Sequence, residues 1–420
     1  MRILVISNLF PPDIVGGYEM QCSSATEELR KRGHEVMVLT SVPRRRIEAS
    51  DDHILRLLRT PDVYSPDRYG IRSPFWEFEA NLLNVENIYI LMDLLDRWRP
   101  DVCYLWSLVA LGGAAMVSAL EHLEMPWVWH LGDAVPADLS HFDGELRELG
   151  ALFGRTWSGR FLACSQTVVN SVERLVSIAG RTRIVPNWIE MPVANRRDEE
   201  LGKGEYRIVF SGRLHEEKGI FVLLDAVAEL RARGRTDFRL EIVGTGDEAA
   251  VRSRIATLGI AEHISLRGWL PRTDLYEVLA ASDLFAFPTH MNDPMPLAPL
   301  EAAALGCVPL LPRVSGVSEW LVDGVHCLKA ERTPEDFATA IEWSMDHPDD
   351  LAAIARRGAG VVRESFLPES VMPIVEEELV LAARKARPEM TRIPEVYGIA
   401  LLADAVLRRH ALAIANRDAR

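Results

Sequence analysis

The sequence predicts an α/β protein built from two Rossmann-like, doubly wound domains that face each other across a cleft. Short apolar runs rich in β-branched residues alternate with stretches of helical length, and this alternation predicts parallel sheets covered by helices on both faces. The alternation restarts after a polar segment in the middle of the chain. A chain of 420 residues is also too long for one hydrophobic core. We therefore expect an N-terminal domain over 1–192, a C-terminal domain over 205–365, and terminal helices over 366–420.

The first half opens with a buried strand. Residues 3–7 are apolar and β-branched, which suits a strand covered on both faces. A loop with Pro11, Pro12, Gly16 and Gly17 follows, and the helical stretch after it ends at Gly33. The expected strands are 3–7, 35–40, 102–106, 127–130, 161–164 and 183–185, and the expected helices include 18–32 and 75–99.

The second half repeats the pattern after a linker. Residues 191–205 are polar and contain Pro192, Gly202 and Gly204, as expected between domains. The expected strands are 207–210, 239–243, 264–266, 284–287 and 308–311. The expected helices are 220–233, 248–258, 273–281, 297–305 and several from 334 onward, including the amphipathic stretches 367–385 and 394–416.

Composition and charge exclude several classes of protein. The net charge of −14 disfavours nonspecific binding to nucleic acid, which needs a positive surface. The basic cluster 44–46 could contact anionic lipid, but a solvated loop is the favoured interpretation. Five cysteines without a C-x-x-C pair indicate buried thiols in a reducing compartment. No stretch is long and apolar enough to span a membrane, so we expect a cytoplasmic protein.

Ligands of parallel α/β sheets bind at the carboxyl ends of strands, in the loops that lead into helices. Five segments of this chain occupy such positions, and they are the expected places for chemistry. They are Gly16 with Gly17, His130, residues 212–218, residues 244–246 and residues 293–301.

Two carboxylates stand eight positions apart in the last of these segments. Asp293 lies in a Pro-broken loop, and Glu301 lies in an Ala/Leu run that reads as a helix ending at Gly306. Carboxylates accept hydrogen bonds from hydroxyl groups, and a helix N-terminus attracts anions. By itself, the segment could equally be a surface loop before an ordinary helix. The loop residues that would contact a ligand are Met295, Pro296, Leu297 and Ala298.

Two cations follow the first strand of the second half. Arg213 and Lys218 stand five positions apart across a strand-to-helix turn that ends at Gly219. A guanidinium fork and an ammonium group in this arrangement could bind a diphosphate from two sides. The alternative is a charged helix entrance, in which Glu216 and Glu217 pair with the cations.

The remaining segments carry weaker signals. Gly16 and Gly17 could expose N–H groups to an anion, although a flexible turn is as good an interpretation. His130 could hydrogen-bond a sugar hydroxyl or move a proton, but a lone histidine is usually structural. No ligand set for a metal accompanies it, so no metal is expected. Gly244 begins a G-x-G-x-x-A run that suggests NAD, but it follows the second strand of its half, whereas the dinucleotide motif follows the first.

These motifs together resemble those of a known family. The run Leu300-Glu301-Ala302-Ala303-Ala304-Leu305-Gly306-Cys307-Val308-Pro309, preceded by Asp293, resembles the acid-x7-acid signature of the retaining nucleotide-sugar glycosyltransferases of family 4. The run from Gly212 to Gly219 resembles their Gly-Arg-x-x-x-x-Lys-Gly element. Two departures stand out, because the first acid is Asp and not Glu, and Pro296 has no N–H to donate.

The resemblance implies a GT-B fold and a metal-independent, retaining transfer of a sugar from a nucleotide-diphosphate sugar to an acceptor hydroxyl, with no further cofactor. It implies that Glu301 holds the ribose, Arg213 and Lys218 neutralise the leaving diphosphate, and Asp293 with 295–298 contacts the sugar. Gly244 and residues 267–269 would border the base. In the first domain, Gly16, Gly17 and His130 would contact phosphate, acceptor or sugar. At least one helix of 366–420 would cross back to that domain.

Other functions remain open on the sequence. The Gly244 run would support an NAD-dependent oxidoreductase, and the same fold could carry a nucleotide-sugar epimerase or a phosphorylase. A two-lobed binding protein without catalysis is a third possibility. A glycosidase is disfavoured, because it needs two carboxylates flanking one bond. The acceptor could be a small molecule, a lipid-linked sugar or a polysaccharide.

Overall fold

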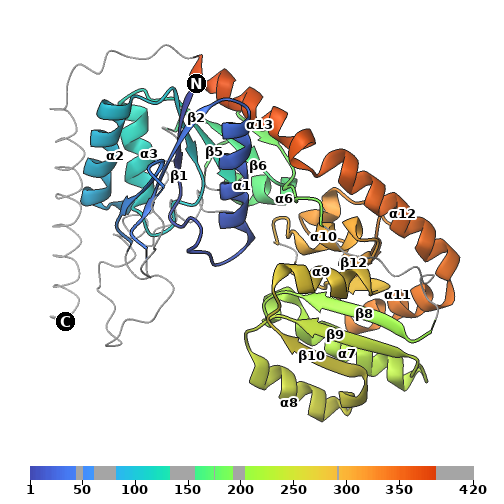
Figure 1. Cartoon of the computed structure of the whole chain (residues 1–420). Helices are drawn as coiled ribbons and strands as arrows, with labels where there is room; N and C mark the ends of the chain where they lie inside the picture. The colour runs from blue at the N-terminus through green and yellow to red at the C-terminus, as the bar shows by residue number, and fades with distance from the viewer. Residues whose placement is uncertain are drawn as a thin grey trace, which may run out of the picture. The chain divides into compact units, whose positions relative to one another are not determined.

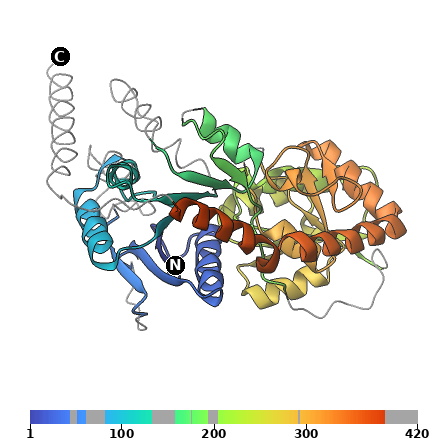
Figure 2. The same cartoon turned by 90° about the horizontal axis from the view of Figure 1, so that it is seen from above.

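The computed structural model of the chain describes residues 1–43, 51–60, 82–132, 157–174, 176–192, 204–290 and 293–384. It divides into two α/β units (Figures 1 and 2). Unit 1 comprises Met1–Ala163, Val168–Ile184 and Met372–Arg420, and unit 2 comprises Cys164–Thr167 and Val185–Val371. Residues 44–46, most of the expected linker 191–205, and the expected helix 394–416 lie outside the described residues.

Unit 1 contains a seven-stranded parallel sheet in the order β3-β2-β1-β4-β5-β6-β7. Its central strands are fully buried, as the apolar runs predicted. Strand β3 was not expected from the sequence, although four of its five residues are apolar; it is an edge strand and is only partly buried. The strands are β1 (Arg2–Ile6), β2 (Glu35–Ser41), β3 (Ile54–Leu58), β4 (Val102–Leu105), β5 (Trp127–Leu131), β6 (Arg160–Ala163) and β7 (Thr182–Ile184).

The helices of unit 1 cover its sheet. Figure 1 shows α2 and α3 side by side on one side of the strands and α1 on the other. The C-terminal part of α13 also belongs to this unit, because Glu378, which is 3% exposed, pairs with Arg160 at 2.5 Å. The helices are α1 (Gly17–Lys31), α2 (Val85–Trp98), α3 (Gly113–His122), α6 (Gln166–Glu173) and α13 (Pro368–Ala383).

Unit 2 contains a six-stranded parallel sheet in the order β10-β9-β8-β11-β12-β13. The short edge strand β13 was not expected either, since three residues carry no usable pattern. The strands are β8 (Tyr206–Ser211), β9 (Phe238–Val243), β10 (Ile264–Gly268), β11 (Leu284–Ala286), β12 (Val308–Pro312) and β13 (Leu328–Ala330).

Helices lie on both faces of this second sheet. Helix α7 packs against α8 and α11, and α10 packs against α9 and α12 (Figure 1). The prediction of two doubly wound α/β units is therefore confirmed. The α-helices are α7 (Ile220–Ala232), α8 (Glu248–Leu258), α9 (Arg272–Ala280), α10 (Ala298–Ala304), α11 (Pro334–Asp346) and α12 (Pro348–Ser365), and the 3₁₀ turns are η3 (Glu216–Lys218), η4 (Ala261–His263) and η5 (Val317–Glu319).

Two further observations concern the described parts of the chain. None of their helices combines the length and the apolarity needed to cross a bilayer. All five cysteines are buried free thiols, and burial raises the pKa of Cys103 and Cys327, so that both stay protonated near neutral pH.

Candidate functional site

The strongest cluster of chemical groups lies where the strand order of unit 2 reverses. The chain places β9 and β10 on one side of β8, and β11, β12 and β13 on the other. The carboxyl ends of β8 and β11 therefore form the topological switch point of the sheet, which is where such sheets bind ligands. The loops that follow these two strands carry Arg213, Lys218 and Asp293.

Lys218 and Asp293 form the centre of this cluster. The Lys218 ammonium lies 2.6 Å from Asp293 Oδ2, although the two residues are 75 positions apart. Asp293 is only 3% exposed, and Thr289 donates a second hydrogen bond to the same oxygen. The Lys218 ammonium also lies 5.8 Å from the centre of the Phe287 ring. The second cation of one sequence motif and the first acid of the other are therefore direct partners.

Arg213 is exposed at the start of the same loop, two residues after β8, and no ion pair or hydrogen bond joins its side chain to the part of the chain that the structure describes. The paired acids of the alternative interpretation, Glu216 and Glu217, do not bind it. The side chain of His215 accepts a long hydrogen bond from the Glu217 N–H and so caps the N-terminus of η3. Arg213 is thus available to an anion, whereas Lys218 already has a carboxylate partner.

The Gly244 loop packs against the Lys218 loop, and this contact explains its glycines. The Leu214 N–H donates to the Thr245 carbonyl, and Leu214 and Gly246 form a bridge. A Cβ atom on Gly244 would lie 1.9 Å from the Gly212 carbonyl oxygen. Close approach of two backbones therefore requires glycine here. The run follows β9 and not the first strand of its sheet, so the interpretation as a dinucleotide motif is not favoured.

Glu301 lies in the first turn of α10 and is 7% exposed. Its Oε1 atom accepts hydrogen bonds from Arg272 Nη2 at 2.6 Å and Nε at 3.2 Å, and from the Tyr276 hydroxyl at 3.1 Å. Burial lowers the pKa of Arg272, but the attraction to Glu301 outweighs it and the net pKa is raised. Burial, reinforced by the Glu301 charge, raises the pKa of Tyr276. Tyr276 is therefore a neutral donor and Arg272 a permanent cation.

The loop between the two acids is held at several points. Asn187 Nδ2 donates to the Met295 carbonyl at 2.8 Å, and the Gly316 N–H donates to the Asp293 carbonyl at 2.9 Å. Met295 is 3% exposed, whereas Pro296, Leu297 and Ala298 are half-buried. Helix α10 has only seven residues and carries Pro299 as its second. Its N-terminus therefore offers fewer N–H groups than the sequence pattern suggested.

In unit 1, the structure brings Gly16, Gly17 and His130 close together through Tyr18. The Tyr18 hydroxyl donates to the His130 carbonyl, and its ring packs against Gly132, where a Cβ atom would lie 2.3 Å from it. The Gly16 N–H already donates to the Glu19 carboxylate at 2.8 Å. Both glycines are exposed, but this N–H group serves the first turn of α1 and not an external anion.

His130 is completely buried at the end of β5. Its ring stacks on Trp106 with 4.4 Å between centroids, and Nδ1 lies 2.7 Å from the Tyr104 hydroxyl. Burial lowers the pKa of His130 to about 3. The imidazole is consequently neutral near pH 7 and suits a hydrogen bond better than proton transfer. The neighbouring Asp133 lies outside the described residues.

The low pKa of His130 predicts a specific loss of stability in acid. A histidine in the unfolded chain titrates near about 6.5, so below that pH the unfolded state binds more protons than the folded state. The contribution of the neutral His130 to the free energy of unfolding is complete above pH 6.5 and is lost progressively as the pH falls toward 3. Between pH 7 and pH 5, the free energy of unfolding should fall by about 2 kcal/mol more in the wild type than in His130→Gln. Urea denaturation at both pH values measures this difference, and equal losses would show that His130 is not held neutral.

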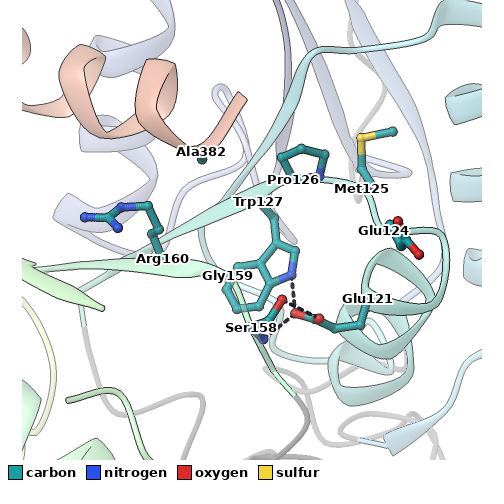
Figure 3. A pocket seen from close by; sticks show the side chains of 9 residues that line it. All are labelled: Glu121, Glu124, Met125, Pro126, Trp127, Ser158, Gly159, Arg160 and Ala382. Atoms are coloured by element: carbon teal, nitrogen blue, oxygen red, sulfur yellow. Dashed lines mark hydrogen bonds between the residues drawn. The ribbon is translucent and has the colours of Figure 1, made fainter. Parts of the chain in front are cut away.

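A different hollow of about 280 Å³ lies in unit 1, at the amino ends of β5 and β6 (Figure 3). Glu121 accepts hydrogen bonds there from the Trp127 indole N–H, the Ser158 N–H and the Ser158 hydroxyl. Arg160, at the other side, pairs with Glu378. Glu121, Ser158 and Arg160 therefore already have partners within the protein. The hollow lies at the amino ends of the strands, which is not where parallel sheets bind ligands.

Sequence reasoning missed three residues of the unit 2 cluster. Arg272 and Tyr276 are four positions apart, so they lie on one face of α9, and that spacing was the available signal. Thr289 stands three positions after β11, where any polar residue faces the carboxyl edge of the sheet.

Within the described residues, no three His, Cys, Asp or Glu side chains gather as a metal would need.

Comparisons with known proteins agree with this architecture. The family model described as Glycosyltransferase Family 4 matches residues 15–191, and the model described as Glycosyl transferases group 1 matches residues 194–360. The glycogen synthase of Mycobacterium tuberculosis is 24% identical and covers 94% of this chain and 98% of its own length. A GDP-mannose-dependent alpha-mannosyltransferase of Corynebacterium glutamicum is 26% identical over 82% of this chain and 81% of its own.

Solved structures show the same fold at low identity. A sucrose-phosphate synthase from Thermosynechococcus elongatus superimposes with a TM-score of 0.69 at 18% identity, covering 90% of this chain and 97% of that one. Anabaena HepE in complex with UDP-glucose gives 0.68 at 16% identity, covering 91% and 100%.

Two doubly wound parallel-sheet units and the similar solved structures define a GT-B fold, and the family models and the relatives define the class as a glycosyltransferase. The family models cover one unit each, in the order that this fold requires. The chain belongs to the family 4 type of these glycosyltransferases, and it is an enzyme.

Proposed function

We propose that this glycosyltransferase takes a sugar from a nucleoside-diphosphate sugar and transfers it to an acceptor hydroxyl with retention of anomeric configuration and without a metal. Unit 2 binds the donor in this proposal, and unit 1 provides the acceptor side through the exposed Gly16 and Gly17, whereas His130 is completely buried. The names of two similar proteins support a donor of this kind, since HepE was solved with UDP-glucose and the relative from C. glutamicum is GDP-mannose-dependent.

One observation carries the proposal. The switch point of unit 2 carries the groups that a nucleoside-diphosphate sugar requires, namely two cations for the diphosphate and two acids for hydroxyls. Lys218 and Asp293 are in contact, and Arg213 is exposed in the same loop as Lys218. Glu301 follows eight residues after Asp293. Each of these groups comes from a loop or a helix start at the carboxyl edge of the sheet.

The Lys218–Asp293 pair is compatible with phosphate binding. An ammonium group has three N–H donors, and Asp293 uses one of them. Asp293 therefore fixes the position of the cation while other donors remain for phosphate oxygens. Arg213, with no partner among the described side chains, would supply the second cation.

The reaction needs negative charge to be stabilised on the leaving group. The bond between the anomeric carbon and the phosphate oxygen breaks, the acceptor oxygen bonds to that carbon, and the acceptor proton passes to the leaving phosphate. The phosphate oxygen gains charge as the bond breaks, so fixed cations stabilise the transition state more than the bound donor. Lys218 and Arg213 perform this task in the proposal, and Asp293 with residues 295–298 orients the sugar.

The nucleoside would lie toward β9 and β10. Gly244 borders this region, and Trp269 stands there with 70% of its surface exposed, directly after Gly268. An exposed aromatic ring next to a nucleotide site can stack on a base. Glu301 would accept hydrogen bonds from the ribose hydroxyls.

Titration calorimetry with UDP, GDP, ADP and NAD tests the donor class, followed by turnover assays with the sugar derivatives of whichever nucleotide binds. We expect saturable binding of at least one nucleoside diphosphate, turnover that persists in EDTA, and a product with the anomeric configuration of the donor by NMR. Binding of NAD without any nucleoside diphosphate would reverse the proposal in favour of an oxidoreductase. Inverted product would contradict retention alone, and loss of turnover in EDTA would contradict metal independence alone.

A further inference from the structure

The two oxygens of the Glu301 carboxylate are used unevenly by the protein. All three donors that reach it, two from Arg272 and one from Tyr276, bind Oε1. No hydrogen bond joins Oε2 to a donor among the described residues. The side chain is 9% exposed, so one oxygen is fixed by the protein and the other remains available to a ligand.

Arg272 itself is held firmly. It is the first residue of α9, directly after Pro271, and its guanidinium lies 5.5 Å from the centre of the Tyr276 ring. Helix α9 packs against α10, which carries Glu301. Two N–H groups of one planar guanidinium on a single oxygen restrict rotation of the carboxylate, whose terminal torsion is otherwise broad.

We propose that Arg272 is a positioning residue that makes Glu301 selective for a ribose, by fixing Oε1 and thereby aiming Oε2 at the sugar hydroxyls of the nucleotide. The inference rests on the proposed binding of a nucleoside diphosphate to unit 2. Arg272 does not touch the substrate in this proposal. Tyr276 helps to fix Oε1 as a neutral hydrogen-bond donor.

Selectivity for a ribonucleotide over its dideoxy form should therefore depend on Arg272, although Arg272 does not contact the ligand. A hydroxyl that donates to a buried carboxylate contributes strongly, and its loss leaves that oxygen without a partner. The wild type should therefore bind a ribonucleoside diphosphate about 10-fold or more tightly than its 2′,3′-dideoxy form. Without Arg272, the carboxylate can turn, and this ratio should shrink although Glu301 is still present.

Calorimetry with UDP, GDP or ADP, whichever the wild type binds most tightly, and with its 2′,3′-dideoxy form measures the ratio. We expect Arg272→Met and Glu301→Gln to reduce it to about 3-fold or less. Arg272→Lys keeps the charge without the fork and should give an intermediate ratio. The matched control is Arg254→Met, which removes an arginine that binds Asp225 through two hydrogen bonds of 2.8 Å and should leave the ratio unchanged.

A merely structural role for Arg272 would weaken both ligands equally and leave the ratio intact, which would overturn the inference. A wild type that binds both forms equally would also overturn it, since Glu301 would then not contact the ribose. Absence of any nucleoside-diphosphate binding would instead overturn the proposed function. If Arg272→Met does not fold, the double variant Arg272→Met/Glu301→Gln shows whether the unpaired buried charge of Glu301 is the cause. The affinity ratio of Arg272→Lys then tests the positioning role.

Discussion

Replacing Lys218 by alanine is expected to lower turnover about 100-fold or more, which is the scale of losing one charge contact that strengthens in the transition state. The ammonium is held 2.6 Å from Asp293 and therefore has a defined position before any ligand arrives. Turnover at saturating donor measures the effect. Lys329→Ala is the control, because this lysine of the same unit donates to the Ser318 carbonyl and has no role in the proposed site. Its turnover should stay within about 3-fold of the wild type.

The same substitution should also destabilise unit 2. Asp293 is 3% exposed and would keep only Thr289 as a side-chain donor, and a buried charge without its partner costs about 3 kcal/mol. The double substitution Lys218→Ala/Asp293→Asn should recover most of that stability, because the neutral amide can still accept from Thr289. It should not recover turnover. Recovery of turnover together with stability would mean that Lys218 is only structural, and an unaltered rate in Lys218→Ala would remove it from the site.

Replacing Gly316 by alanine is expected to reduce kcat/KM about 100-fold. The backbone of Gly316, with φ of −59° and ψ of −40°, suits any residue, so conformational strain plays no part. A Cβ atom there would lie 1.3 Å from the Pro294 carbonyl oxygen and 2.8 Å from Ser165 Oγ. The loop that begins at Asp293 would have to move by more than 1 Å, and a displacement of that size near reacting groups costs about 100-fold in rate.

Steady-state kinetics and thermal unfolding together measure this effect. Overpacking at Gly316 should also lower the free energy of unfolding by about 1–3 kcal/mol. Gly360→Ala is the matched control, because Gly360 lies inside α12 with no heavy atom within 4 Å of an added Cβ. It should leave kcat/KM unchanged and raise stability by about 0.5–1 kcal/mol. Wild-type kcat/KM in a stable Gly316→Ala protein would show that the loop from Asp293 to Leu297 does not position the donor.

Much of the fold could be predicted because buried parallel strands leave a strong local pattern. Residues 3–7 and 102–106 are apolar runs bounded by loops, and they became the central strands β1 and β4. Edge strand β3 escaped prediction although four of its five residues are apolar. Edge strand β13 escaped because three residues carry little pattern of their own. The order of the strands follows from the preferred handedness of crossovers only once all strands are known.

The sequence by itself determined the two motifs at 212–219 and 293–309. Each motif is a local run, and the turn between a strand and a helix constrains its spacing and its residue types. Arg213, Lys218, Asp293 and Glu301 could be named for that reason. Only the tertiary structure decided which of them are partners, because Lys218 meets Asp293 and Arg272 meets Glu301 across separations of 75 and 29 residues. It also decided that His130 is buried and neutral. Burial and long-range pairing depend on how the helices and loops pack around a sheet, and no short run of residues encodes that packing.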